Sequence, residues 1–221
     1  YAPGSTFKVV TTVAAQRAGI FDEHRPAVCR GSYQVGNRRF RCMGNHGSIS
    51  FRRAMERSCN VYFADLAIRV GPDRLRETAL ELGLGRRTGI DLPGESAGIL
   101  PTPEWWARHR DRRFGPGDTV NLSVGQGELA TTPLQMAVVA ATLANRGRTI
   151  RPHIVKGWRE PGGALELLEP TESGRIDAPE AFWRAMDASL LAAVETGTVG
   201  RGRVPGLRWA GKTGSAENRK E

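Results

Sequence analysis

The pattern of apolar and polar positions predicts a first helix close to the start of the chain. A Pro-Gly pair is followed by an apolar, Ala-rich run from Ser5 to about Ala18, and Gly19 interrupts that run. Such boundaries are typical of a helix. Ser5 therefore falls in the first turn of the predicted helix. The residues expected on its buried side are Val10, Val13 and Ala14.

Further helices follow from the same periodicity. A short one is capped by Ser50 and extends through Glu56. A proline at the first helical position and a glycine just past the end mark another helix, which starts at Pro133 and stops before Gly147. The helices expected after the short one cover, in order, residues 61–68, 72–83, 132–145 and 179–195.

Strands are expected over residues 149–156 and 207–213. The remaining segments are rich in turn-forming residues. Residues 21–48 are polar and predict an excursion loop with one hairpin, and residues 86–119 predict a long connection. Residues 122–128 predict a Gly-rich turn. Helices and strands therefore both contribute, and helices dominate.

The composition is that of a globular protein of one domain. The chain has 221 residues, of which 39% are hydrophobic and 25% are charged. The formal net charge is +9, but the basic residues are scattered and no nucleic-acid-binding motif occurs. We therefore expect no nucleic-acid partner. No run of about 18 apolar residues and no leader segment is visible.

Lysine use is more informative than net charge. The chain has 32 basic residues, of which only Lys8, Lys156, Lys212 and Lys220 are lysines. Arginine effectively never loses its proton, whereas a buried lysine can. A chain that otherwise uses arginine but keeps Lys8 and Lys212 in its motifs fits a need for an amine that acts as a base.

Ser5 and Lys8 form a candidate nucleophile and base. Their spacing of three places both side chains on one face of the predicted helix. A serine hydroxyl is a poor nucleophile until a base takes its proton, and a lysine that is desolvated in a cleft can do so. The first helical turn also offers free N–H groups to a developing oxyanion. The tetrapeptide alone is common in helices, so its weight depends on the other motifs.

Two further motifs follow in the order that this chemistry needs. Ser58 can relay a proton between Lys8 and an amine, and Asn60 can hydrogen-bond a substrate amide. Lys212 and Thr213, on the last predicted strand, present donors for a carboxylate. Gly214 lets a substrate approach the backbone closely, and the N–H of Ser215 is a second candidate oxyanion donor. Ser-x-x-Lys, Ser-x-Asn and Lys-Thr-Gly are the motif set of penicillin-binding proteins and class A β-lactamases.

At this point the sequence resembles the transpeptidase domain of class B penicillin-binding proteins, most closely the elongation-type penicillin-binding protein 2. The resemblance covers essentially the whole chain. Besides the three motifs, the similar segments are residues 1–8, 88–95, 101–105, 117–119, 123–128 and 132–136. It implies an α+β fold of the serine β-lactamase/transpeptidase kind, in which helices flank an antiparallel sheet and a helical subdomain holds Ser58 and Asn60. In this family Gln126 lies near the cleft.

The resemblance also implies a domain that is incomplete at both ends. The family places sheet strands before the Ser5 helix and after the Lys212 strand, together with a pedestal and an N-terminal membrane anchor. We expect residues 1–221 to be a truncated transpeptidase domain that lacks these parts. The membrane would be reached only through that anchor, which places the domain at the extracytoplasmic face of the bacterial inner membrane.

The activity that the resemblance implies is acyl transfer between peptidoglycan stem peptides. Ser5 attacks the D-Ala-D-Ala bond, D-Ala leaves, and an amine of a neighbouring stem takes the acyl group. Ser5, Lys8, Ser58, Asn60 and Lys212 are the catalytic residues carried over, with Thr213, Gly214 and Ser215 in substrate binding. β-Lactams would acylate Ser5, a glycosyltransferase would be the partner, and no cofactor is needed for catalysis.

Two related functions share the motifs. A serine β-lactamase must also hydrolyse its acyl-enzyme, which needs a positioned base, and no Glu-x-x-Leu-Asn segment of the class A kind occurs. Class D enzymes usually have Val in the third place of the middle motif, where Asn60 stands. A non-catalytic β-lactam sensor is the other alternative, and attachment to a signalling segment would distinguish it.

The cysteines allow two interpretations. Cys29, Cys42, His46 and Cys59 supply three thiolates and one imidazole, which suit a closed tetrahedral zinc site. Some elongation-type relatives carry a metal at similar positions, and Cys59 lies inside the middle motif. The alternative is a Cys29–Cys42 disulfide with Cys59 buried and free.

Overall fold

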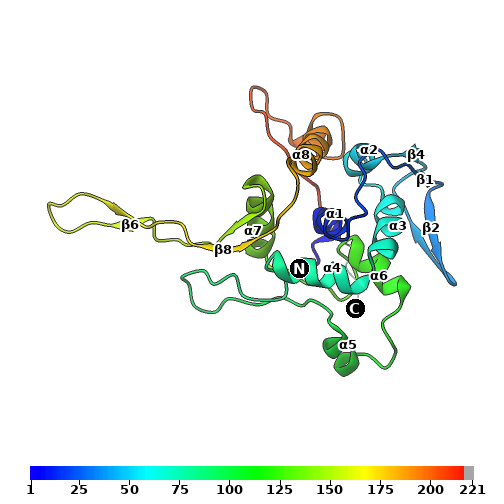
Figure 1. Cartoon of the computed structure of the whole chain (residues 1–221), viewed down its shortest axis with the longest axis horizontal. Helices are drawn as coiled ribbons and strands as arrows, with labels where there is room; N and C mark the ends of the chain where they lie inside the picture. The colour runs from blue at the N-terminus through cyan, green and yellow to red at the C-terminus, as the bar shows by residue number, and fades with distance from the viewer. Residues whose placement is uncertain (217–221) are drawn as a thin grey trace.

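A computed structural model shows how these segments are arranged, and it describes residues 1–216. Lys220 lies outside the described residues. Helices dominate, and the hairpin that carries β6 projects away from them (Figure 1). The helices, with the 3₁₀ turns η1 and η2, are η1 (Gly4–Phe7), α1 (Lys8–Arg17), α2 (Phe51–Glu56), α3 (Asn60–Val70), α4 (Pro72–Glu81), α5 (Pro103–His109), α6 (Pro116–Ser123), α7 (Pro133–Ala144), α8 (Glu180–Glu195) and η2 (Gly200–Gly202).

The strands of the described residues pair two by two, and every pair is antiparallel. In the excursion, β1 pairs with β4 and β2 pairs with β3, so one ladder is nested inside the other. Later in the chain β5 pairs with β8, and β6 pairs with β7. The strands are β1 (Ala27–Cys29), β2 (Ser32–Val35), β3 (Arg38–Arg41), β4 (Gly47–Ile49), β5 (Arg148–Ile150), β6 (Gly157–Trp158), β7 (Glu166–Leu167) and β8 (Glu172–Arg175).

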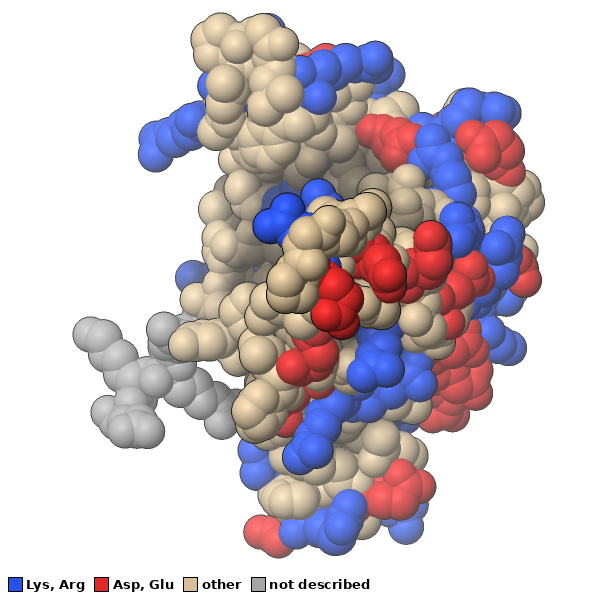
Figure 2. Space-filling model, turned by 90° about the vertical axis from the view of Figure 1, so that its left-hand side faces the viewer, with Lys and Arg blue, Asp and Glu red and all other residues tan. Residues whose placement is uncertain are grey.

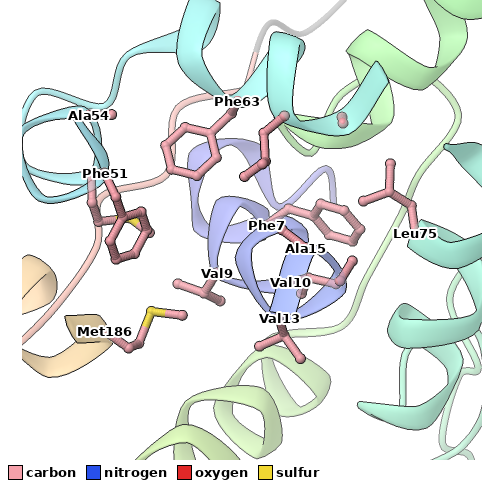
Figure 3. Packing of buried hydrophobic residues seen from close by; sticks show 14 of the residues in the cluster. Phe7, Val9, Val10, Val13, Ala15, Phe51, Ala54, Phe63, Leu75 and Met186 are labelled. Carbon is pink, nitrogen blue, oxygen red and sulfur yellow. The ribbon is translucent and has the colours of Figure 1, made fainter. Parts of the chain in front are cut away.

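The core surrounds α1, which is buried on nearly every side from Lys8 to Ala15. The buried hydroxyls of Thr11 and Thr12 donate to the carbonyls of Ser123 and Lys8, respectively, and the small alanines let neighbouring helices approach closely. Figure 3 shows its side chains among apolar residues of other helices, namely Phe51 of α2, Phe63 of α3, Leu75 of α4 and Met186 of α8. The burial of α1 therefore fixes where the Ser5 end of the helix lies.

Several predicted elements differ from the structure. The connection over residues 86–119 holds α5 and the start of α6, whose first turns are set by Pro103 and Pro116. The excursion over residues 21–48 forms two ladders instead of one hairpin. The strand predicted over residues 149–156 is limited to β5, because only Arg148 to Ile150 find a partner in β8.

The strand predicted over residues 207–213 is wrong for the described chain. This segment is extended but belongs to no ladder, because no segment within residues 1–216 pairs with it. A strand is stabilised by the hydrogen bonds of a neighbour, so sequence pattern alone does not produce one.

No helix of the described residues is long and apolar enough to cross a membrane. On the face drawn in Figure 2, basic and acidic side chains are interspersed. Ion pairs join basic and acidic side chains at several places in the described chain, such as Arg146 with Asp187 and Arg148 with Glu172. That face therefore shows no continuous basic track of the kind that nucleic-acid binding needs.

Candidate active site

Ser5 lies in the 3₁₀ turn η1, directly before α1, and is half-buried. The loop after α6 fixes this turn, because the N–H of Gly4 donates to the carbonyl of Gly125 at 2.9 Å. Gly4 has a φ of +57°, which favours glycine. The predicted place of Ser5 in the first helical turn is confirmed, although that turn is 3₁₀ and α1 begins at Lys8.

Lys8 is fully buried, and its ammonium has three acceptors. Its Nζ donates to the carbonyl of Ser58 at 2.7 Å, to the Ser58 hydroxyl at 3.0 Å and to Oδ1 of Asn60 at 2.8 Å. Burial is the largest cause that lowers the pKa of Lys8 to about 7, and the charge of Lys212 lowers it further. A substantial share of Lys8 is thus a free amine near neutral pH, as a general base requires.

Ser58 stands between two amines. Its hydroxyl oxygen lies 3.0 Å from Nζ of Lys8 and 2.9 Å from Nζ of Lys212. Ser58 has a φ of +53°, a left-handed conformation that is uncommon for a residue with a side chain. A hydroxyl has one proton and two lone pairs, so it can accept from one amine and donate to the other once that amine is neutral. This geometry suits a proton relay.

Asn60 is the first residue of α3, and its amide is held at both ends. Oδ1 accepts from Lys8, and Nδ2 donates to the carbonyl of Arg41 at 3.0 Å. Its own N–H points to the sulfur of Cys42 at 3.2 Å. Strand β3 therefore orients the amide, which the sequence motif does not reveal.

The last motif passes directly over the start of the Ser5 turn. A methyl group added to Gly214 would lie 2.7 Å from the carbonyl oxygen of Pro3, and one added to Gly4 would lie 2.4 Å from that of Ser215. Nε2 of Gln126 donates to the same Ser215 carbonyl at 3.0 Å. The segment that carries Gly214 and Ser215 therefore lies against the turn that carries Ser5.

Lys212 completes the group of amines and hydroxyls. Desolvation lowers its pKa to about 8. The neighbouring Thr213 hydroxyl donates to the hydroxyl of Thr198 at 3.0 Å. Among the described residues the Ser5 hydroxyl itself has no hydrogen-bond partner. Catalytic hydrogen bonds are often loose before binding.

The four candidate metal ligands also come together. Their ligand atoms all lie within 4.8 Å of one another. His46 Nδ1 lies 3.4 Å from the sulfur of Cys29 and 3.6 Å from that of Cys42, and the sulfurs of Cys42 and Cys59 are 3.8 Å apart. Tetrahedral zinc with its usual bond lengths separates two sulfurs by about 3.8 Å and a sulfur from a nitrogen by about 3.5 Å. The donor set therefore fits this ion.

All three cysteines are free in the structure, so the alternative Cys29–Cys42 disulfide is not formed. A hydrogen bond shared between Cys42 and Cys59 lowers the pKa of Cys42 to about 4 and raises that of Cys59. The sulfur of Cys59 also accepts the N–H of Tyr62, which caps α3. The cysteine cluster thus touches the turn that carries Ser58 and Asn60.

Sequence reasoning missed the residues that support this site through tertiary contacts. Arg41, Thr198 and Gly125 contribute a carbonyl, a hydroxyl and a close backbone approach, respectively. Arg41 and Thr198 belong to no motif that we recognised. Gly125 and Gln126 lie in the Gly-rich turn over residues 122–128, for which the family resemblance predicted only that Gln126 lies near the cleft.

The comparison with known families agrees with this geometry. A family model described as penicillin binding protein transpeptidase domain matches residues 1–221. The chain belongs to that family. The resemblance drawn from the three motifs is therefore confirmed, and so is the serine transpeptidase fold class.

Named relatives are similar along nearly the whole chain. The peptidoglycan D,D-transpeptidase MrdA of Acinetobacter baumannii is 33% identical over 224 residues, which cover 98% of this chain and 33% of the relative. Penicillin-binding protein 2 of Helicobacter pylori, solved in complex with MreC, has a TM-score of 0.84 and 25% identity over 99% of this chain and 40% of that one.

A third protein has been solved with a ligand. Penicillin-binding protein 3 of Mycobacterium tuberculosis, in complex with aztreonam, has a TM-score of 0.80 and 31% identity, and the match covers 100% of this chain and 49% of that one. The chain spans about a third of the length of the curated relatives it matches.

Proposed function

We propose that this chain is the transpeptidase part of a peptidoglycan D,D-transpeptidase, with Ser5 as its nucleophile. The observation that carries the proposal is the Ser58 hydroxyl, which lies between Lys8 and Lys212, beside the turn that presents Ser5. Acyl transfer from a C-terminal dipeptide requires an amine with a lowered pKa, a hydroxyl that relays protons, and a cation that can bind the substrate's carboxylate.

In the first half-reaction Lys8, as the free amine, takes the proton of Ser5 while Oγ bonds to the carbonyl carbon of the penultimate D-Ala. The N–H groups of Ser5 and Ser215 would stabilise the oxyanion. Lys8 then returns the proton through Ser58 to the nitrogen of the terminal D-Ala, and the peptide bond breaks. The products are an ester on Ser5 and free D-Ala.

In the second half-reaction the same relay runs in reverse. The amine of a neighbouring stem peptide bonds to the ester carbonyl carbon, and Ser58 and Lys8 accept its proton. They deliver that proton to Oγ of Ser5 as the C–Oγ bond breaks, which leaves the cross-linking amide and free Ser5. In the first half-reaction, before D-Ala leaves, Lys212 and Thr213 would bind its terminal carboxylate, and Asn60 would hold the donor amide. A β-lactam would use the same residues and remain as an ester on Ser5.

The family resemblance supports the wider setting of this proposal. We assign residues 1–221 to one transpeptidase domain at the extracytoplasmic face of the bacterial inner membrane. Its partner would be a glycosyltransferase that makes the strands to be cross-linked. No nucleic-acid partner is part of the proposal.

The test uses a fluorescent penicillin with the full-length protein and its Ser5→Ala variant. We expect a label that survives denaturation on the wild type and none on the variant. Rapid turnover without a lasting label would indicate a serine β-lactamase instead. A folded wild type that takes no label would contradict the proposed activity.

We further propose a structural zinc ion held by Cys29, Cys42, His46 and Cys59. A closed site with four protein ligands has no open position for a substrate, so such an ion supplies folding energy instead of chemistry. Its role would be to join the excursion to the start of α3. Metal analysis of the purified protein should find one zinc per chain, and a Cys42→Ser variant should lose it. A zinc-free protein with Cys29 cross-linked to Cys42 would overturn this assignment.

A further inference from the structure

Glu56, the last residue of α2, is a buried carboxylate that the mechanism above does not use. Its side chain is 3% exposed. Both carboxylate oxygens accept from Nη1 of Arg53, at 3.0 and 3.1 Å, and Nε of Arg57 lies 3.5 Å from Oε1. The hydroxyl of Thr196 also donates to Oε1, at 3.1 Å. A carboxylate buried this far is stable only with such partners.

The contact with Thr196 joins two distant parts of the chain. Thr196 follows α8, which lies beside α2 (Figure 1). The main chain makes the same connection, because the N–H of Thr198 donates to the carbonyl of Glu56 at 3.2 Å. A methyl group added to Gly197 would lie 2.4 Å from that carbonyl oxygen. The turn over residues 196–198 is therefore pressed against Glu56.

Each end of this connection reaches a catalytic motif. Glu56 precedes Ser58 by two residues, and Ser58 has the uncommon φ of +53°. At the other end, the Thr198 hydroxyl accepts from Thr213, which is the proposed carboxylate ligand. The carboxylate and the main-chain carbonyl of Glu56 thus hold the turn over residues 196–198 beside the segment that leads to Ser58. The same turn carries the hydroxyl that meets Thr213.

We propose that Glu56 is a positioning residue that sets the Thr213 hydroxyl relative to Ser58 and thereby governs recognition of the donor's terminal carboxylate. The inference rests on the proposed function, because it assumes that Thr213 and Lys212 bind that carboxylate. Glu56 touches neither substrate nor reacting atoms. It acts through Thr196 and the turn that carries Thr198.

The test compares Glu56→Gln and Thr196→Val with the wild-type full-length protein. Glu195→Gln is the matched control, since Glu195 is exposed and directly precedes Thr196. The substrates are an acyl-D-alanyl thioester whose leaving group ends in a free carboxylate, and its methyl ester. We measure the second-order rate constant of acylation for each. Both variants should lose about 10- to 100-fold on the carboxylate substrate, whereas the ester should change by less than about threefold.

Equal losses on the two substrates would show that Glu56 only maintains the fold, and unchanged rates would show that it does nothing for the site. Either result overturns the inference. If Glu56→Gln does not fold, Thr196→Val decides, because it removes a single hydroxyl. A wild type that fluorescent penicillin does not label would refute the proposed function and this inference together. A labelled wild type with unselective variants would refute the inference alone.

Discussion

Lys8 and Lys212 approach the same hydroxyl oxygen, so their protonation states decide what the site can do. Lys8 acts as a base only without its proton, and its pKa is lowered to about 7. Lys212 attracts a carboxylate only with its proton, and its pKa is lowered to about 8. The useful combination is a neutral Lys8 beside a charged Lys212, and it is most populated between these two values.

We therefore expect a narrow bell-shaped pH profile for acylation. The rate should rise with pH through about 7, as Lys8 loses its proton, and fall through about 8, as Lys212 loses its own. The measurement is the second-order rate constant of acylation by a carboxylate-bearing β-lactam. A Lys212→Arg control keeps its charge, so its alkaline limb should disappear. A flat profile between about pH 6 and about pH 9 would contradict these assignments.

The sequence predicted that the motif residues share one site, because each motif combines a residue type with a local spacing, and their catalytic roles stay a prediction. Ser5 and Lys8 are three apart on one helix, and the structure indeed brings Lys8, Ser58 and Lys212 together. The supporting residues could not be predicted. Thr198 acts only because α8 ends beside the Lys212 segment, and no local pattern records that contact.

Among the elements, the loop after α6 supports the Ser5 turn through one glycine. Gly125 has a φ of +70°, and a methyl group added to it would lie 2.1 Å from the carbonyl oxygen of Gly4. We expect Gly125→Ala to displace the Ser5 turn and to slow acylation by about 100-fold. Gly94→Ala is the matched control, since its φ of +77° imposes similar backbone strain in open space. Equal acylation rates in the two variants would show that the loop does not position Ser5.

The nested ladders of the excursion place β3 against the start of α3. Arg41 and Cys42, at the end of β3, both contact Asn60. If zinc holds this cluster, chelation should release β3 and loosen the amide of Asn60. We expect a chelator to lower the acylation rate and to increase hydrogen exchange in residues 27–49, and added zinc should restore both. Hydrogen exchange that does not change on chelation would show that the two ladders are stable without the metal.

Prediction of the elements succeeded where local signals were strong. A capping box joins Thr132 and Gln135, and α7 lies where the Pro133 signal placed it. The helices α5 and α6 were missed because each is short and is surrounded by glycine and proline. The segment over residues 207–213 has a strand pattern but no partner among the described residues, and pairing is a tertiary property.

At the scale of the whole molecule, segments that are far apart in sequence pack around α1. Folding therefore buries the amine of Lys8, and unfolding exposes it to water again. Lys8 is fully buried, and its pKa falls from 10.5 to about 7 in the folded state. Between these values the unfolded chain binds more protons than the folded one. The free energy of unfolding must then increase with pH across that window, and this contribution is lost as pH falls toward about 7.

We expect the Lys8→Met variant to reveal the pH-dependent contribution of Lys8, as the difference between its free energy of unfolding and that of the wild type. Methionine keeps an apolar chain of similar length without the amine, so the variant should be more stable than the wild type at neutral pH. One pKa unit corresponds to about 1.4 kcal/mol, which makes the difference several kcal/mol at about pH 7 and small near pH 10. The measurement is the unfolding transition of this domain in the full-length protein, at several pH values. Because other titrating groups are common to both proteins, a difference that does not change with pH would mean that burial leaves Lys8 with an ordinary pKa.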